Sequence, residues 1–333
     1  MFEAWEVFHR GKMAKQDVLD FSMRLEDELF DLAHDLGNGS YHHGWYERFY
    51  IHDPKRRYIS KASVRDRVLH QALVGVVEPM FDPTFIFDSF SSRKGKGTHA
   101  AIDRLEDFLR RGSRNGSNTI YALKCDVSKF FDSIQHDVLM GMLRRRIIDE
   151  PLLGLVGQVV TSHTSHQGTS CGLPLGNVTS QLFANIYLNG FDHWVKEHLR
   201  VRWYIRFCDD FILLHESRQF LESAIVQIDS YLSQHLHLQL HPYKVSLRTY
   251  QQGIDFLGWV LRPSVRTMRT KTCRRLSHRV DGLVSQYRET GTLQERFSET
   301  VQSCLAAFDH GQGFRNQERL IHSVRQMKFK NLQ

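Results

Sequence analysis

The feature that most constrains this chain is a pair of adjacent carboxylates, Asp209 and Asp210, set between two apolar runs. The runs are VRWYIRF before the pair and FILLH after it, which predicts a β-hairpin with both acids at its turn. Like charges side by side in an apolar setting repel each other and lose hydration, so an ordinary core avoids them. An arbitrary Asp-Asp pair more often only forms a turn, and the apolar flanks argue against that alternative here.

A third carboxylate, Asp126, ends another apolar strand, TIYALKCD, 83 residues before Asp209. From a neighbouring strand it could reach the same place. Two divalent cations about 4 Å apart, held by carboxylates, stabilise the attacking and leaving oxygens of phosphoryl transfer. Magnesium suits oxygen ligands completed by water and substrate phosphate. The three acids therefore predict a site for two Mg²⁺ ions.

Composition is that of a globular protein and excludes a disordered chain. Of 333 residues, 41% are hydrophobic, 24% are charged and only 7 are proline. The 5 cysteines are widely separated and form no C-x-x-C pair, which argues against a disulfide framework and a zinc ribbon. We find no signal-peptide core and no apolar run of membrane-spanning length, so we expect a cytoplasmic protein without a membrane partner.

The net charge of +7 is concentrated at one end of the chain. The segment from Arg262 to Gln333 carries 14 basic and 6 acidic residues, a net +8, whereas the preceding part has a net charge of −1. Basic side chains neutralise phosphates and release counterions, so this tail is a candidate polyanion-binding element. A solvated helical face is the equally open alternative.

Apolar periodicity and turn residues predict alternating helices and strands. Helices are expected over residues 1 to about 40, Val64 to Val77 (capped by Ser63 and closed by Pro79), about Ala100 to Arg111, from Asp132 or Ser133 onward, after the loop GLPLGNV, and Phe220 to Gln234. Strands are expected on both sides of Asp53–Pro54, in TIYALKCDV, in the acidic hairpin, in LHLQLHPYKVSL and in a pair ending GIDFLGWVL. We expect a boundary near Pro263.

These acids and their flanks resemble the palm of reverse transcriptases, over roughly residues 20 to 262 and in the order of that family. Phe207-Cys208-Asp209-Asp210 is similar to its aromatic-x-Asp-Asp box, and DVSKFF from Asp126 is similar to its first metal-binding segment. The primer-grip hairpin is matched by Phe256, Leu257, Gly258 and Trp259, and the finger segments by SVRDRVLHQAL and SFSSRKGKGTH. Cys208 departs from the commoner Ala, Val or Met, at a position whose side chain need not bind metal.

The resemblance implies an α+β fold of the right-hand polymerase type. Together with the apolar periodicity and the charge of the tail, we expect an N-terminal helical segment at residues 1–40, fingers and palm at 41–262, and a short, basic, helical thumb at 263–333. The resemblance implies that Asp126, Asp209 and Asp210 hold both metals, with the carbonyl of Val127 as a backbone ligand. It also implies RNA-directed DNA polymerase activity, a nucleotidyl transfer with deoxynucleoside triphosphates, an RNA template and a DNA or RNA primer.

A narrower resemblance is to the reverse transcriptases of diversity-generating retroelements. LGNVTSQ, from Leu175 through Gly176 to Gln181, is similar to their [ILV]-G-N-x-x-S-Q box, where most other reverse transcriptases have Q-G-x-x-x-S-P. This implies error-prone copying of a template-repeat RNA (mutagenic retrohoming), chiefly at adenines, with a small basic accessory variability protein as partner. A leucine at position 175 offers packing but no hydrogen bond, which should weaken discrimination against mispairs.

Several other residues take roles by the same resemblance. Phe131 occupies the steric-gate position that excludes a ribose 2′-hydroxyl, although one ring of the Phe130-Phe131 pair must serve packing. Lys244 matches the lysine that protonates the pyrophosphate leaving group. The candidates to grip the triphosphate are Arg57, Lys61, Arg65 and Arg67, of which Arg65 and Arg67 could instead form surface ion pairs. From the charge of the tail, and not from the resemblance, Arg274, Arg275 and Arg279 are expected to bind template–primer phosphates.

Other functions stay open beside this one. A reverse transcriptase of a retron, a defence-associated system or a group II intron would share the same acids, although the GNxxSQ box and the short tail weigh against an intron. An RNA-dependent RNA polymerase is disfavoured by the aromatic ring at position 131. A non-catalytic RNA-binding scaffold is disfavoured because all three acids are present.

Overall fold

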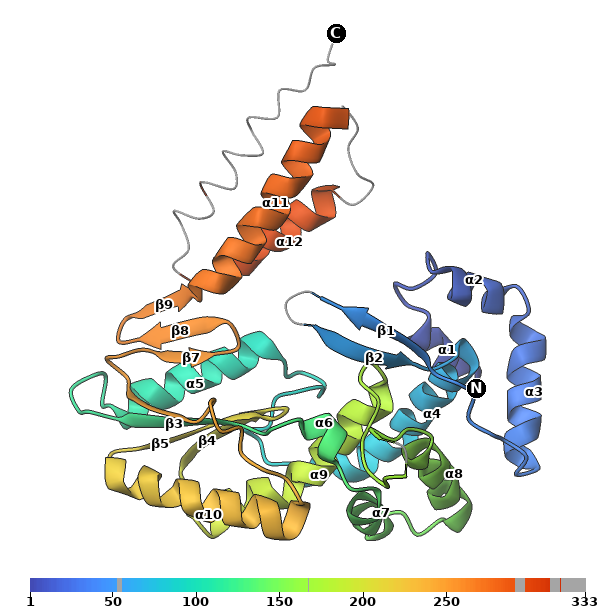
Figure 1. Cartoon of the computed structure of the whole chain (residues 1–333), viewed down its shortest axis with the longest axis horizontal. Coiled ribbons are helices and arrows are strands. Elements are labelled where there is room, and N and C mark those ends of the chain that lie inside the picture. Colours follow the sequence, from blue (N-terminus) through green and yellow to red (C-terminus); the bar gives the residue numbers. More distant parts are fainter. Residues whose placement is uncertain (53–55, 167, 291–296, 312–317, 319–333) are drawn as a thin grey trace. The chain divides into compact units, whose positions relative to one another are not determined.

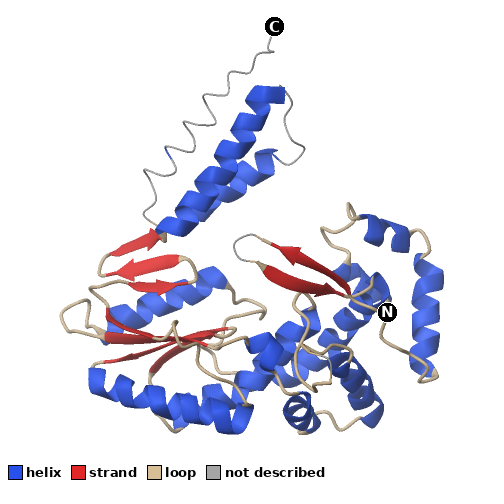
Figure 2. Ribbon diagram, viewed as in Figure 1, coloured by secondary structure: helices blue, strands red, loops and turns tan. Residues whose placement is uncertain are grey.

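The computed structural model describes residues 1–52, 56–166, 168–290, 297–311 and 318 (Figure 1). These residues divide into two compact units. Unit 1 comprises Met1–Gly97, Lys124–Leu213 and Glu222–Val245, and unit 2 comprises Thr98–Leu123, Leu214–Leu221 and the described residues from Ser246 on. Helices and strands are both abundant and follow one another along the chain, so the expected mixture of helix and sheet is confirmed (Figure 2). The boundary expected near Pro263 falls within unit 2.

The N-terminal segment is helical but is not one helix. It forms α1 (Phe2–Phe8), α2 (Gln16–Ser22) and α3 (Leu25–Gly37), the last ending close to the expected end near residue 40. The first break contains Gly11, whose φ of 68° lies in the left-handed region that a helix does not use. Apolar side chains of α1 and α2, among them Trp5 and Phe21, pack with Val64 and Val68 of a later helix.

An antiparallel hairpin and a long helix follow, as predicted. Strands β1 (Glu47–Ile51) and β2 (Arg57–Lys61) pair in register from Glu47 opposite Lys61 to Ile51 opposite Arg57. The expected turn at Asp53–Pro54 lies outside the described residues.

Helix α4 (Val64–Phe81) begins as predicted, because the Ser63 hydroxyl accepts a hydrogen bond from the backbone N–H of Asp66 at 3.1 Å. The predicted end at Pro79 is wrong, since α4 continues through this proline to Phe81. A proline so near the C-terminus removes a single helical hydrogen bond, and the buried side chain of Phe81 holds the last turn in the core. A 3₁₀ turn, η1 (Asp82–Thr84), follows directly.

The central sheet has the strand order β4-β5-β3-β6. Its strands are β3 (Tyr121–Asp126), β4 (Trp203–Phe207), β5 (Asp210–His215) and β6 (Ser246–Thr249). Ile205 of β4 and Ile212 and Leu213 of β5 are fully buried, which explains the apolar runs around the two acids. Helices α9 (Val178–Glu197) and α10 (Arg218–Leu236) also match their predictions to within a few residues.

The helix expected from Asp132 or Ser133 is interrupted. It forms α6 (Phe130–Ser133) and α7 (His136–Arg144), followed by α8 (Glu150–Thr161). Between α6 and α7 the chain is extended, because Gln135 bridges to Cys171 and the carbonyl of Ile134 accepts a hydrogen bond from Gly172 at 2.8 Å. The partner segment lies far along the chain, so local periodicity carries no sign of this break.

Unit 2 contains α5 (Thr98–Gly112) and an antiparallel three-stranded sheet. Its strands are β7 (Ile254–Phe256), β8 (Trp259–Arg262) and β9 (Val265–Met268), so the predicted pair is present and a third strand was missed. Two helices follow, α11 (Thr270–Thr290) and α12 (Phe297–Asp309), which share a core of Cys273, Val280, Val284, Val301, Cys304 and Phe308. The strand expected in LHLQLHPYKVSL is mostly irregular and is regular only where β6 begins.

No helix within the described ranges is both long enough and apolar enough to cross a membrane.

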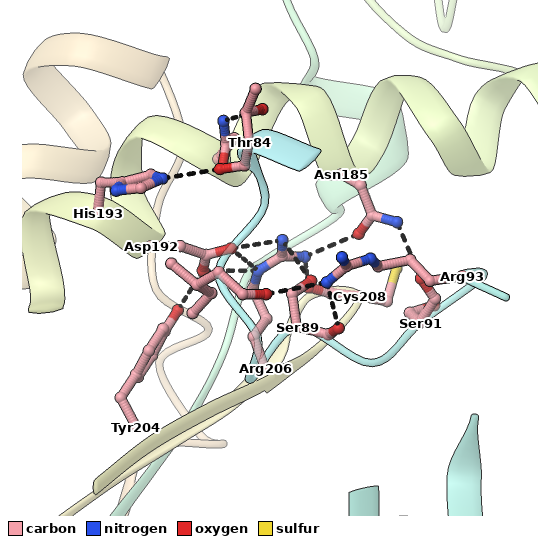
Figure 3. Close-up of polar contacts among 12 residues, drawn as sticks. Thr84, Ser89, Ser91, Arg93, Asn185, Asp192, His193, Tyr204, Arg206 and Cys208 are labelled. Carbon is pink, nitrogen blue, oxygen red and sulfur yellow. Dashed lines mark hydrogen bonds and ion pairs between the residues drawn. The ribbon is translucent and has the colours of Figure 1, made fainter. Parts of the chain in front are cut away.

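The core of unit 1 contains a fully buried ion pair between Arg206 of β4 and Asp192 of α9 (Figure 3). Nε of Arg206 donates to Asp192 Oδ1 at 2.8 Å and Nη2 donates to Oδ2 at 2.7 Å, a bidentate geometry. The hydroxyl of Tyr204 donates to the same carboxylate at 2.6 Å. Both carboxylate oxygens of Asp192 therefore accept hydrogen bonds inside the core.

We expect Asp192→Asn to lower the free energy of unfolding by about 3–5 kcal/mol, because it leaves a buried guanidinium without its counter-charge. Urea unfolding at neutral pH measures this loss. The matched control is Glu28→Gln, which removes an ion pair with the exposed Arg24 at the surface and should cost about 1 kcal/mol or less. Equal losses in the two variants would contradict the role given to the buried pair.

Candidate active site

The three carboxylates singled out by the sequence lie together at one end of the two inner strands of the central sheet, β3 and β5. Asp126 is the last residue of β3, Asp209 lies in the connection between β4 and β5, and Asp210 is the first residue of β5. Strands β3 and β5 are neighbours in the sheet, and the backbone N–H of Val127 donates to the carbonyl of Asp209 at 3.3 Å. The two acidic segments are thus joined directly through their backbones.

The buried side chain of Arg206 holds the turn that carries Asp209. Cys208 has a φ of 56°, so the chain turns sharply through a left-handed residue before the two acids. Nη1 of Arg206 donates to the carbonyl of Cys208 at 3.0 Å and to Oδ1 of Asn185 at 3.2 Å (Figure 3). A guanidinium fixed by Asp192 therefore fixes the backbone of the acidic turn.

The three carboxylates are half-buried, and burial disfavours the ionised forms of Asp209 and Asp210. Burial, together with the neighbouring carboxylate of Asp126, raises the pKa of Asp209 above its usual range. Burial raises the pKa of Asp210 to about 6, although the ammonium group of Lys124 opposes the shift. These shifts are typical of a group of acids that a cation would stabilise.

Two lysines already supply part of that positive charge. Nζ of Lys244 donates to Asp126 Oδ1 at 2.6 Å, and Nζ of Lys124 lies 3.2 Å from Asp210 Oδ2. A turn places Lys244 there. The N–H of Lys244 donates to the carbonyl of His241, and the N–H of His241 donates to the carbonyl of Asp126 at 2.8 Å.

The donor set fits a divalent cation. Asp210 Oδ1 is buried and has no hydrogen-bond partner among the described residues, so it is an acceptor in need of a positive charge. Within those residues no three His, Cys, Asp or Glu side chains are already gathered tightly enough to hold a metal by themselves. A cation here would therefore draw on carboxylates now paired with lysine, together with backbone and substrate oxygens.

The two phenylalanines of α6 differ in burial. Phe130 is 2% exposed and belongs to the core, whereas Phe131 is only half-buried. Packing is therefore served by Phe130, and the ring of Phe131 is available for the expected gate. Its position is fixed by the backbone, since the carbonyl of Phe131 accepts a hydrogen bond from Leu173 at 2.8 Å.

The loop before α9 lies against the hairpin β1–β2. The carbonyl of Leu175 accepts a hydrogen bond from the N–H of Ser60 at 3.3 Å. Gly176 has a φ of 112°, and a Cβ at this position would come within 3.2 Å of the Ile59 side chain. Gln181 is exposed in the first turn of α9. The structure thus brings Leu175 and Gly176 to β2, the strand that carries Arg57 and Lys61.

Of the four candidate triphosphate ligands, three are engaged with acids. Lys61 pairs with Asp17 at 2.8 Å and with Glu47 at 3.1 Å. Arg65 pairs with Asp35, and Arg67 pairs with Asp17. Arg65 and Arg67 therefore form ion pairs, the alternative left open by the sequence. Arg57 is exposed at the start of β2.

The remaining predicted residues lie in unit 2. Leu257 and Gly258 connect β7 to β8 with φ values of 49° and 91°, so Phe256 and Trp259 flank a two-residue turn of the kind that suits a tight hairpin. Arg274, Arg275 and Arg279 are all exposed on α11.

Sequence reasoning missed the residues that support the acids, namely Lys124, Asn185, Asp192 and Arg206. A signal was present for two of them. Arg206 interrupts an otherwise apolar strand, and Asp192 interrupts the apolar face of α9, and both are fully buried. A charged residue inside a buried run implies a buried counter-charge, although the sequence does not say which residue provides it.

The raised pKa of Asp210 makes stability depend on pH. Because this carboxyl group is disfavoured when ionised, its contribution to folding is fully present below about pH 4 and is lost as the pH rises through about 6. Asp210→Asn cannot ionise. In a metal-chelating buffer we expect the stability of this variant, relative to wild type, to rise by about 2–3 kcal/mol between pH 4 and pH 7. Urea unfolding at several pH values measures it, and a difference that does not change with pH would contradict this account.

Comparison with known proteins gives the same family as the motifs. Residues 52–261, more than half of the chain, match the family described as reverse transcriptase (RNA-dependent DNA polymerase). Protein YkfC of Escherichia coli is 27% identical over 273 residues, covering 71% of each chain. The group II intron-encoded protein LtrA of Lactococcus lactis is 24% identical over 52% of this chain, which spans only 29% of LtrA.

Solved structures agree at the level of the fold. An apo telomerase from Candida tropicalis superposes with a TM-score of 0.55 at 11% identity, over 86% of this chain and 62% of the telomerase. A Candida albicans telomerase solved with a fragment of telomeric RNA gives a TM-score of 0.53 at 12% identity. Because the family match covers more than half of its length, this chain belongs to the reverse transcriptase family of RNA-dependent DNA polymerases.

Proposed function

We propose that this chain copies an RNA template into DNA, with Asp126, Asp209 and Asp210 at its active site. The observation that carries the proposal is the meeting of three carboxylates, of which Asp209 and Asp210 have raised pKa values and Asp210 keeps an unpartnered buried oxygen. Bringing these carboxylates together lowers the stability of the folded chain. A cation and a polyphosphate bound at the site would compensate for that loss.

The residues that would hold two Mg²⁺ ions are the three aspartates and the carbonyl of Val127. When bound, the ions would lower the pKa of the primer 3′-hydroxyl and neutralise the triphosphate. Lys244, next to Asp126, carries a proton on Nζ that it can donate to the departing pyrophosphate. Arg206 keeps the acidic turn in place without touching substrate. The chain thus contributes mainly positioning and electrostatics.

Substrate choice is assigned to two apolar side chains. The half-buried ring of Phe131 would meet a 2′-hydroxyl and so favour deoxynucleotides. Leu175, held beside β2, would pack against the nascent pair without a hydrogen bond. The exposed arginines of α11 are assigned to the phosphates of template and primer.

For the biological role we propose a diversity-generating retroelement, with error-prone copying of a template-repeat RNA and a small basic accessory protein as partner. The LGNVTSQ segment beginning at Leu175 supports this role. A group II intron-related lineage is the second candidate, and the similarity to LtrA favours it. The two candidates differ in the fidelity expected at template adenines.

We expect Asp209→Asn to reduce DNA synthesis on an RNA template by about 100-fold or more, because it removes one ligand charge from the metal site. Primer extension with Mg²⁺ measures the rate, and a chelator should abolish it in wild type. The control is Asp132→Asn, which neutralises an exposed carboxylate of α6. Near-normal extension by a folded Asp209→Asn variant would contradict the catalytic assignment.

We expect Leu175→Gln to lower misincorporation opposite template adenines, by about tenfold for each 1.4 kcal/mol of discrimination regained. The added amide can form the polar contact that a mispair disrupts. Sequencing of cDNA made from one defined RNA measures the error rate. Leu175→Met, of similar size and without an amide, should keep the wild-type rate. Wild-type copying that is as accurate at adenines as elsewhere would favour the intron-related lineage.

A further inference from the structure

Helix α6, which carries Phe131, consists of a single short turn. The backbone N–H of Ser133 donates to the carbonyl of Lys129 at 3.0 Å, which closes this turn. Lys129 precedes α6 with a left-handed φ of 43°, and the chain is extended again at Ile134. The last carbonyls of a helix have no partner inside it, so α6 depends on donors from other segments to stay in place.

One later segment supplies these donors. The N–H of Leu173 donates to the carbonyl of Phe131 at 2.8 Å. The hydroxyl of Ser165 donates to the carbonyl of Asp132, also at 2.8 Å. We call Ser165 together with residues 170–173 the brace. Two consecutive carbonyls of α6, one of them belonging to Phe131 itself, are therefore fixed by the brace.

The brace is itself held together by short contacts. The N–H of Ser165 donates to the carbonyl of Cys171 at 2.9 Å. Gly172 has a φ of 106°, and a Cβ there would overlap the hydroxyl oxygen of Ser165, so only glycine permits this close approach. The carbonyl of Gly172 accepts a hydrogen bond from Nε2 of the buried His136 at 2.8 Å. These contacts keep the hydroxyl of Ser165 directed at α6.

We propose that Ser165 helps to set the choice between deoxyribonucleotides and ribonucleotides, by fixing the position of Phe131. A steric gate rejects a 2′-hydroxyl only while its ring occupies the place of that hydroxyl, and a displacement of about 1 Å at an active site can change a rate about 100-fold. Ser165 is a positioning residue, because its hydroxyl bonds to the backbone of α6. The inference rests on the proposed function of Phe131 as the gate and adds the group that holds the gate in place.

The test is the ratio of kcat/KM for a ribonucleotide to kcat/KM for the matching deoxyribonucleotide, measured by primer extension with the full chain. Ser165→Ala should raise this ratio about fivefold, the size of one ordinary hydrogen bond, through a lower KM for the ribonucleotide. The matched control is Thr169→Val, which removes a hydroxyl that donates to the nearby carbonyl of His166 at 2.7 Å. It should leave the ratio unchanged. Loss of stability alone lowers both efficiencies together, so the ratio separates positioning from a merely structural role.

A double-mutant cycle with Phe131→Ala shows whether Ser165 acts through the ring. Phe131→Ala alone should raise the ratio by more than Ser165→Ala does, since it removes the gate. In the Phe131→Ala background, Ser165→Ala should change the ratio by less than about 1.5-fold, because no ring is left to be positioned. Equal rises in both backgrounds, or an unchanged ratio in a folded Ser165→Ala variant, would overturn the proposal. Equal effects of Ser165→Ala and Thr169→Val would also overturn it.

Failure of this inference is distinguishable from failure of the proposed function. A ratio that rises in Phe131→Ala and stays at the wild-type value in Ser165→Ala would reject only the brace. A ratio that Phe131→Ala leaves unchanged would reject the gate on which the brace acts. Synthesis that no longer needs Asp209 would reject the catalytic assignment, whatever the ratio.

Discussion

The guanidinium of Arg206 joins the acidic turn to α9 and to Ser89, which lies more than 100 residues earlier in the chain. It pairs with Asp192 and Asn185 on α9, donates to Ser89 Oγ at 3.0 Å, and holds the carbonyl of Cys208. The backbone of the same residue bonds to Asp88 and Phe90, both at 3.0 Å, which adds the segment after η1 to the edge of β4. A rigid, fully hydrogen-bonded cation is suited to this task because its donors have fixed directions. The acidic turn therefore takes its shape from the core beneath it.

Local patterns in the sequence predicted what depends on local chemistry. Alternating and continuous apolar runs gave β3, β4 and β5, and the acids at their ends gave the place where Asp126, Asp209 and Asp210 meet. The Ser63 cap set the start of α4, which the structure confirms. In each of these cases the residues that decide the outcome lie within a few positions of one another.

Patterns failed where a distant partner decides the outcome. Ile134 leaves the helix because residues near Cys171 pair with it, and β9 forms because β8 offers an edge. Pro79 ended the predicted helix too early, since burial of Phe81 outweighs the lost hydrogen bond. Lys124 was missed for a similar reason. Its ion pair with Asp210 forms only because the neighbouring strand β5 brings that carboxylate beside it.

The contacts of Lys124 and Lys244 with the acids have a consequence for how the site fills. Three carboxylates face two ammonium groups, and Asp210 is part-protonated near neutrality. A divalent cation that binds these carboxylates would replace the lysine ammonium groups and the protons that now contact them. Metal uptake should then release protons to the solvent, and the displaced lysines become able to contact the phosphates that arrive with the metal. Without a cation, the two lysines thus offset part of the negative charge of the three aspartates.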